Sequence, residues 1–254
     1  TVPTSSAARM PRRLVIGPLL GSIITVLQQP PSMELHTFSI VARAANGDVG
    51  VAVATARPNV GSLVPWVARG VAIATQARVD TDLGRRGIAL VEQGVPVDVA
   101  LPALLARDPE RERRQVHGLD ARRGFCHTGG ECVAWRGHEQ GPDFSVAGNM
   151  LAGPQVIGAM ASGFRRTAQL ELAERLLTAL EAGQAAGGDQ RGKQSAALLV
   201  AAAEPRMYHN LRVDDHPEPV AELRRLFDVV VAHAAEIERE YGAEGARSFG
   251  RVKW

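Results

Sequence analysis

The sequence predicts an α+β fold in which two antiparallel β-sheets pack face to face and a pair of helices covers the outer side of each sheet. Three observations predict this four-layer αββα sandwich. Strands and helices come in runs rather than in the strict alternation of a doubly wound fold. The first two strands flank an Asn-Gly turn at 46–47, which is typical of an antiparallel hairpin. Apolar residues make up 45% of the chain, enough to fill a large core.

The first half of the domain supplies three strands and then two helices. Residues 36–44 alternate and are rich in β-formers, and residues 49–55 form a second, apolar strand after the turn. Residues 70–79 are almost continuously apolar, which indicates a strand covered on both faces. Residues 83–93 and 97–106 have helical spacing and are bounded by Gly or Pro.

The second half repeats this order. The periodicity predicts the following elements: strands at 115–120, 124–135 and 145–150, helices at 154–164 and 170–186, a strand at 195–203, and a long amphipathic helix at 219–241. The long helix has an apolar face that either packs on its own sheet or forms a contact between copies of the chain. A homodimer or a higher homo-oligomer is therefore expected as a partner.

The first 32 residues differ from the rest. A basic stretch precedes an apolar run at 14–27, as in a signal peptide, but Gly and Pro interrupt the run and no small-residue cleavage site follows. Three interpretations of the extension remain open. It is a segment that is foreign to the natural protein or translated from upstream of it, or it is an ordered arm, or it is an export signal. We expect a cytoplasmic protein unless the segment 10–27 is a genuine signal. The chain divides into an N-terminal extension, one domain and a C-terminal tail: 1–32, 33–241 and 242–254.

Charge and motif content narrow the function classes. The formal net charge of +2 gives no electrostatic case for nucleic-acid binding, and we expect no membrane partner. The GxGxxG, Walker and GxSxG patterns are absent, so neither a phosphate-binding loop nor a conventional serine hydrolase is expected. Cys126 and Cys132 alone cannot build a zinc site, and reduced thiols are the expected state. We predict no metal and no cofactor.

Polar side chains gather where predicted strands begin or end. The stretch 187–195 (GGDQRGKQS) leads into a buried strand and offers Asp189, Arg191 and Gln194, although it also fits a helix C-cap loop with a local ion pair. Asn149 lies between a strand and a helix, where its amide could stabilise an oxyanion or simply form a turn. Three more residues could face a pocket or complete the sheet and core: Trp66, Thr75 and Gln76.

These segments together resemble a known family. They match in order: 37–43 (TFSIVAR), 64–66 (VPW), 74–76 (ATQ), 148–151 (GNML), 187–200, and 212–223. The chain resembles the bacterial domain-of-unknown-function family 1028 over about residues 37–227. That family looks like a branch of the N-terminal-nucleophile (Ntn) hydrolases, which have the αββα sandwich.

The resemblance implies a chemistry for the first strand residue. In Ntn hydrolases this residue is Thr, Ser or Cys, and its hydroxyl or thiol attacks an amide carbonyl while its own free α-amine acts as base. An α-amine has a pKa of about 8 and is partly neutral at physiological pH. The resemblance thus implies Thr37 as nucleophile and Asn149 and Asp189 as further catalytic residues. The substrate-binding candidates are Thr75, Gln76, Trp66, Arg191 and Gln194.

The sequence departs from the family pattern before Thr37. In the family the opening Thr usually follows the initiator Met, whereas here Glu34, Leu35 and His36 lie between Met33 and Thr37. Thr37 can act as an N-terminal nucleophile only if the His36–Thr37 bond is cut.

Three functions remain open at this point. The first is an Ntn-type amidohydrolase that cleaves a small amide or peptide-like substrate. The second is a catalytically silent metabolite-binding or assembly protein on the same fold. The third is a metal-assisted hydrolase that uses His117, His127 or Cys126.

Overall fold

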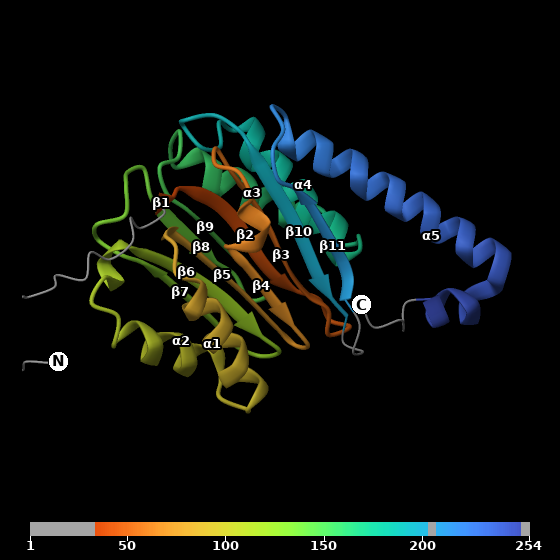
Figure 1. The fold of residues 1–254 in the computed structure, drawn as a ribbon, viewed down its shortest axis with the longest axis horizontal. Helices are drawn as coiled ribbons and strands as arrows, with labels where there is room; N and C mark the ends of the chain where they lie inside the picture. Colours follow the sequence, from red (N-terminus) through yellow and green to blue (C-terminus); the bar gives the residue numbers. More distant parts are fainter. Residues whose placement is uncertain (1–33, 203–206, 250–254) are drawn as a thin grey trace, which may run out of the picture. The chain divides into compact units, whose positions relative to one another are not determined.

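Residues 34–202 and 207–249 are described by the computed structural model, and they form two antiparallel sheets and five α-helices (Figure 1). The α+β class predicted from the sequence is therefore confirmed, whereas the predicted extension at 1–32 lies outside the described residues. The small sheet comprises β1 (Glu34–Leu35), β4 (Pro65–Ala68), β5 (Val71–Arg78), β6 (Arg114–Asp120) and β7 (Gly124–Thr128). The large sheet comprises β2 (Thr37–Arg43), β3 (Val49–Thr55), β8 (Gly137–Gln140), β9 (Phe144–Gly148), β10 (Ser195–Ala201) and β11 (Met207–Val213).

Helices cover the outer face of each sheet (Figure 1). On the small sheet lie α1 (Thr81–Glu92), which begins after the capping carboxylate of Asp80, and α2 (Val97–Leu105). On the large sheet lie α3 (Gln155–Arg166) and α4 (Leu172–Ala185). Short 3-10 turns occur at Val60–Ser62 and Arg111–Arg113. The layers thus run helices, small sheet, large sheet, helices.

Three apolar clusters separate these layers. Because side chains alternate along a strand, a central strand contributes to two of the clusters. In β2, Phe38 and Ile40 pack toward α3 and α4, whereas Val41 packs between the sheets. In β5, Ala74 packs between the sheets and Ile73 packs toward α1 and α2. The same alternation decides which polar side chains enter the space between the sheets.

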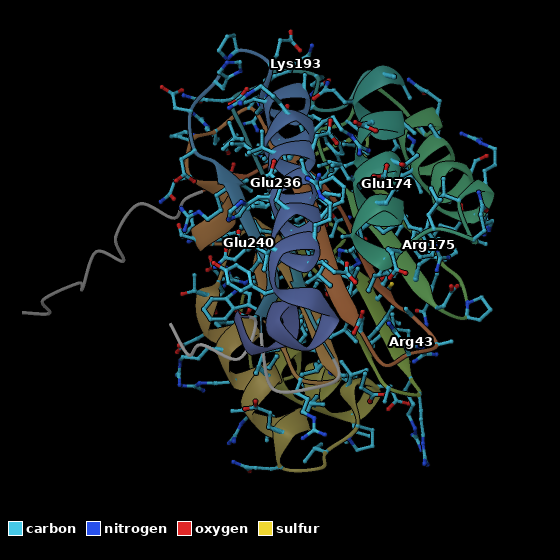
Figure 2. The ribbon with its side chains drawn as sticks, turned by 90° about the vertical axis from the view of Figure 1, so that its right-hand side faces the viewer. Arg43, Glu174, Arg175, Lys193, Glu236 and Glu240 are labelled. Carbon is cyan, nitrogen blue, oxygen red and sulfur yellow. The ribbon has the colours of Figure 1, made fainter. Side chains whose placement is uncertain are left out.

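The last helix, α5 (Pro219–Phe249), packs on the large sheet only with its first turns. Leu223 and Phe227 are buried, and Arg224 pairs with Glu174 of α4, whereas the helix is mostly exposed from Asp228 onward. Figure 2 shows Glu236 and Glu240 along this exposed part. Gly242, with φ 69°, interrupts the helix where the sequence predicted the tail to begin. The homo-oligomer expected from this helix stays a prediction.

The sequence missed several strands. The unpredicted strands are β1, β4, β8 and β11, and the strand expected at 124–135 ends at Thr128. The chain leaves the strand at Gly129, where an added Cβ would lie 2.3 Å from the Glu112 carbonyl oxygen, so a residue with a side chain would not fit there. Among the residues described, no helix is both long enough and apolar enough to cross a membrane.

Candidate functional site between the sheets

The chain passes from the small sheet to the large sheet at the bond before Thr37. Leu35 pairs with Ala77 at the edge of β5, and two residues later Thr37 pairs with Thr55 of β3. His36 bridges the sheets and is 6% exposed, while the Thr37 side chain is fully buried. The His36–Thr37 peptide bond therefore lies at one end of the layer between the sheets.

The carbonyl group of His36 receives two hydrogen bonds. The Thr55 hydroxyl donates to this oxygen at 2.5 Å, and Nη2 of Arg191 donates at 2.9 Å. The Thr37 hydroxyl donates to the Leu35 carbonyl at 2.6 Å. A neutral donor and a cationic donor on one carbonyl oxygen polarise the bond that precedes Thr37.

Arg191 is held in place by Asp189. Nη2 of Arg191 lies 2.6 Å from Asp189 Oδ2, and Nε lies 3.0 Å from Oδ1, so the pair is bidentate. Asp189 is 3% exposed, and its Oδ2 also accepts from the Ala56 amide at 3.1 Å. The local ion pair considered from the sequence is present, and it aims the guanidinium at His36.

Two predicted motifs meet beside this pair. The Gln190 amide donates to the Met150 carbonyl at 3.0 Å, and Leu151 forms an isolated β-bridge with Asp189. Gly187 and Gly188 have φ of 118° and 53°, a conformation that costs glycine little. The glycine-rich loop thus reaches the end of β9 and brings Asn149 and Asp189 to the same site as Thr37.

Asn149 is fully buried and belongs to a hydrogen-bond network. Its Oδ1 lies 2.8 Å from His36 Nδ1, and its Nδ2 donates to Gln115 Oε1 at 2.9 Å. Gln76 Nε2 donates to the same oxygen at 2.8 Å. Gln115 Nε2 donates to the Gly148 carbonyl at 2.9 Å, which fixes the orientation of the Gln115 amide. Asn149 is therefore held in one orientation, with His36 occupying its free side.

The network continues to a histidine deeper between the sheets. The Ser39 hydroxyl donates to Gln76 Oε1 at 2.6 Å, so it can only accept from Nε2 of His117, 2.8 Å away. Nδ1 of His117 then accepts from the Ser145 hydroxyl at 2.8 Å. Burial lowers the pKa of His117 to about 3, and the imidazole is neutral. Both ring nitrogens are used, so His117 has no nitrogen free to bind a metal.

Acid is expected to destabilise the domain through this histidine. His117 titrates near 6.5 when unfolded and only near 3 when folded, so stability is complete above pH 6.5 and falls as the pH is lowered toward 3. The free energy of unfolding should drop by about 2 kcal/mol per such histidine between pH 7.5 and 5. Urea denaturation at both pH values measures this loss.

A substitution separates His117 from the other groups. His117→Gln should shrink the acid-induced loss by about 2 kcal/mol, because glutamine hydrogen-bonds but does not titrate. His233→Gln, on the exposed part of α5, should leave the loss unchanged. An equal loss in His117→Gln and in the unmodified chain would contradict the assignment.

Three predicted site residues lie elsewhere. Thr75 faces α1 and donates to the Asp80 carbonyl at 3.2 Å, because its neighbour Gln76 takes the inner face of β5. Trp66 packs on the outer side of the small sheet, where an added Cβ on Gly84 would lie 2.2 Å from its ring. The Gln194 side chain turns to Asp215, 3.2 Å away. Thr37, Gln76, Asn149, Asp189 and Arg191 are brought together.

Comparison with known proteins supports the recognised motifs. A family of unknown function, DUF1028, matches residues 37–223. The chain belongs to this family. The crystal structure of protein SPO2555 from Silicibacter pomeroyi, described as a DUF1028 protein, is similar with a TM-score of 0.70 and 31% identity, covering 76% of this chain and 85% of that chain. The curated proteins include none that matches.

The DUF1028 match begins at Thr37, the first residue of β2. Sequence reasoning missed four polar residues of this site: Ser39, Thr55, Gln115 and Ser145. His117 was considered only as a metal ligand. A usable signal existed in β2, because Ser39 has the same parity as Thr37 and must enter the space between the sheets with it. No comparable local pattern marks Thr55 on β3, Gln115 on β6 or Ser145 on β9.

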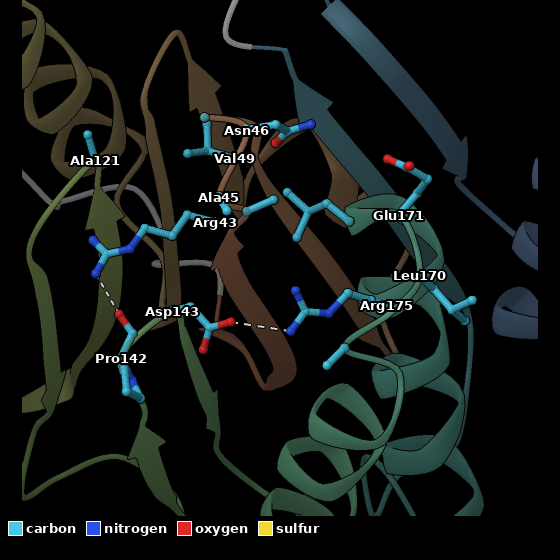
Figure 3. A pocket seen from close by; sticks show the side chains of 14 residues that line it. Arg43, Ala45, Asn46, Val49, Ala121, Pro142, Asp143, Leu170, Glu171 and Arg175 are labelled. Carbon is cyan, nitrogen blue, oxygen red and sulfur yellow. Dashed lines mark hydrogen bonds and ion pairs between the residues drawn. The ribbon is translucent and has the colours of Figure 1, made fainter.

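The DUF1028 chain also has a pocket of about 810 Å³ at the opposite end of β2 (Figure 3). Arg43 and Arg175 line it together with Asp143, whose Oδ2 lies 3.2 Å from Arg175 Nη2. Arg43 donates to the carbonyl groups of Asp120 and Pro142 at 2.7 and 2.5 Å. None of the predicted site residues lines this pocket.

Metal ligands do not cluster in the described part of the DUF1028 chain. No group of three or more His, Cys, Asp or Glu side chains is placed to hold a metal ion there. Cys126 and Cys132 are free thiols, and burial raises the pKa of each to about 11. Both cysteines are therefore protonated at neutral pH and are weak nucleophiles.

Proposed function

We propose that this protein is an N-terminal-nucleophile amidohydrolase that hydrolyses a small amide or peptide-like substrate with the hydroxyl of Thr37. The observation that carries the proposal is the pair of donors, Thr55 and Arg191, on the carbonyl oxygen of His36. Donors placed on the carbonyl oxygen of a bond to be cut stabilise the negative charge that develops when the carbon is attacked. The layered α+β fold and the family match that begins at Thr37 also support it.

The first reaction would be on the chain itself. The Thr37 hydroxyl adds to the His36 carbonyl carbon, the C–N bond breaks, and the hydroxyl proton ends on the departing Thr37 amine. An ester then links His36 to Thr37. Water hydrolyses the ester and leaves a His36 carboxylate, a free Thr37 hydroxyl and a free α-amine that can act as general base.

The same steps would serve an external substrate. The free α-amine takes the proton of the Thr37 hydroxyl as it attacks the substrate amide, and then protonates the leaving amine. Arg191 and Thr55 would lie at the oxyanion, and departure of His36 would release Oδ1 of Asn149 for a substrate donor. Asp189 would position Arg191 rather than touch the substrate.

Intact-mass measurement and N-terminal sequencing test the proposal directly. We expect a processed chain that begins at Thr37, without the 36 preceding residues, and amide hydrolysis by that chain in a panel of N-acyl amides. A chain that keeps the His36–Thr37 bond and hydrolyses no amide would contradict the proposal.

Thr55 provides a sharper test of the carbonyl donors. Thr55→Val keeps the shape of the side chain but removes the hydroxyl that donates to His36, so self-cleavage should slow by a factor of about 10²–10³. Thr75→Val makes the same change at a buried threonine whose hydroxyl faces α1, and it should cleave at nearly the unmodified rate. Equal rates for both variants in a mass-spectrometric time course would argue against the role of Thr55.

One observation favours a second function, a ligand-binding protein without turnover. The buried polar network between the sheets is complete while His36 is in place, since the His36 ring hydrogen-bonds to Asn149 and Arg191 donates to the His36 carbonyl. An uncleaved chain would keep this closed form. Binding of a metabolite to the intact chain without hydrolysis would support the second function.

A further inference from the structure

The segment Glu34–His36 occupies the site in a definite way. Its backbone adds a short antiparallel strand to the edge of β5 at Ala77 and Arg78, beyond the residues of β5 that pair with β4. Main-chain pairing at an open strand edge is a common way to bind an extended peptide. Removal of the segment would leave this part of the β5 edge free.

Each side chain of the segment contacts the rest of the domain, and Nε2 of His36 also lies 3.5 Å from Glu34 Oε2. Glu34 forms an ion pair with Arg113 and is partly exposed. Leu35 is fully buried in the apolar layer between the sheets. His36 lies 2.8 Å from Asn149, and its carbonyl holds the two donors described above. The segment thus presents an acidic side chain to Arg113, an aliphatic side chain to the apolar layer and a hydrogen-bonding side chain to Asn149.

The chemistry relates this segment to a substrate. Self-cleavage and substrate hydrolysis would pass through the same group, an acyl ester on the Thr37 hydroxyl. The acyl part of the self-cleavage ester is Glu34-Leu35-His36. The acyl part of a substrate must attach to the same oxygen and direct its carbonyl to the same donors, so it would fill the same space.

We propose that Glu34–His36 marks the acyl-binding subsite of the enzyme, and that the substrate is an extended peptidyl amide. The substrate carries an acidic residue opposite Arg113, an aliphatic residue in the Leu35 position and a hydrogen-bond donor beside Asn149. This inference rests on the proposed function for its catalytic step, but the peptide subsite can be tested without catalysis.

Binding to the full-length chain tests the subsite. All chains carry Thr37→Ala, which keeps the His36–Thr37 bond intact. Leu35→Asp places a charge in an apolar layer and should detach the segment from β5. Titration calorimetry should then detect acetyl-Glu-Leu-His-amide bound to the Leu35→Asp chain, and no binding to the chain that retains Leu35.

The peptide series checks each position. Acetyl-Glu-Ala-His-amide should bind at least about tenfold more weakly, because alanine buries much less apolar surface than leucine in the Leu35 position. Acetyl-Lys-Leu-His-amide should bind a few fold more weakly, and Arg113→Glu should reverse that preference. Leu35→Gly, which removes the buried side chain without adding a charge, is a second way to detach the segment if Leu35→Asp does not fold.

Three outcomes separate the claims. Failure of both detached chains to bind acetyl-Glu-Leu-His-amide, or equal binding of all peptides, overturns the subsite. Binding with the expected preferences, but no hydrolysis of the matching 4-nitroanilide by a chain that keeps Thr37, retains the subsite and counts against the proposed function. Hydrolysis without any preference among the peptides supports the function and overturns the subsite.

Discussion

Replacement of Thr37 by Ala is expected to leave the chain at full length and to lower amide hydrolysis by a factor of at least about 10³. The alanine has no hydroxyl to attack the His36 carbonyl, so neither the ester nor the free α-amine can form. The buried hydroxyl makes one hydrogen bond, to the Leu35 carbonyl, so its removal should have a modest effect on folding. Intact mass, an amide-hydrolysis assay and thermal unfolding of the same preparation measure the three effects.

Thr37→Ser is the matched control. Serine keeps the attacking oxygen and its position at the start of β2, so self-cleavage and hydrolysis should both persist at a reduced rate. A Thr37→Ala chain that still loses its first 36 residues would mean that another protease cuts the bond, and the carbonyl donors would then lose their assigned role.

The sequence predicted the strands and helices with regular periodicity better than it predicted the site. β2, β3 and β5 alternate or are continuously apolar, and each was located to within a few residues. β11 (MYHNLRV) was missed because His209 interrupts the apolar series of Met207, Leu211 and Val213, and its pairing with β10 has to be supplied by the rest of the fold.

Side-chain direction explains which site residues were predictable. Thr75 and Gln76 were both expected to face a pocket, but neighbouring residues on a strand point to opposite faces, and only Gln76 faces Ser39. The contact of His117 with Ser39 spans 78 positions in sequence and depends on how the two sheets stack. That stacking is set by the apolar residues between the sheets, so no local pattern reports it.

The ion pair of Asp189 and Arg191 gives the largest expected effect on stability. Arg191→Met should lower the free energy of unfolding by about 3–5 kcal/mol, because it leaves a buried carboxylate without its cationic partner. The Asp189 side chain is 0% exposed, so water cannot replace the guanidinium without a rearrangement of the loop. Chemical denaturation measures the loss. Lys193→Met, which breaks an exposed ion pair with Glu218 in the same loop, should cost less than about 1 kcal/mol.

The double variant Asp189→Asn/Arg191→Met separates charge from packing. If the cost arises from the uncompensated carboxylate, removal of that charge should recover more than half of the stability lost in Arg191→Met, since asparagine can still accept from the Ala56 amide. The recovered chain would nevertheless lack the cationic donor on the His36 carbonyl, so its self-cleavage should stay slow by a factor of about 10² or more. Recovery of stability without recovery of cleavage would assign Arg191 a chemical role beyond folding, whereas recovery of both would reduce the pair to a structural contact.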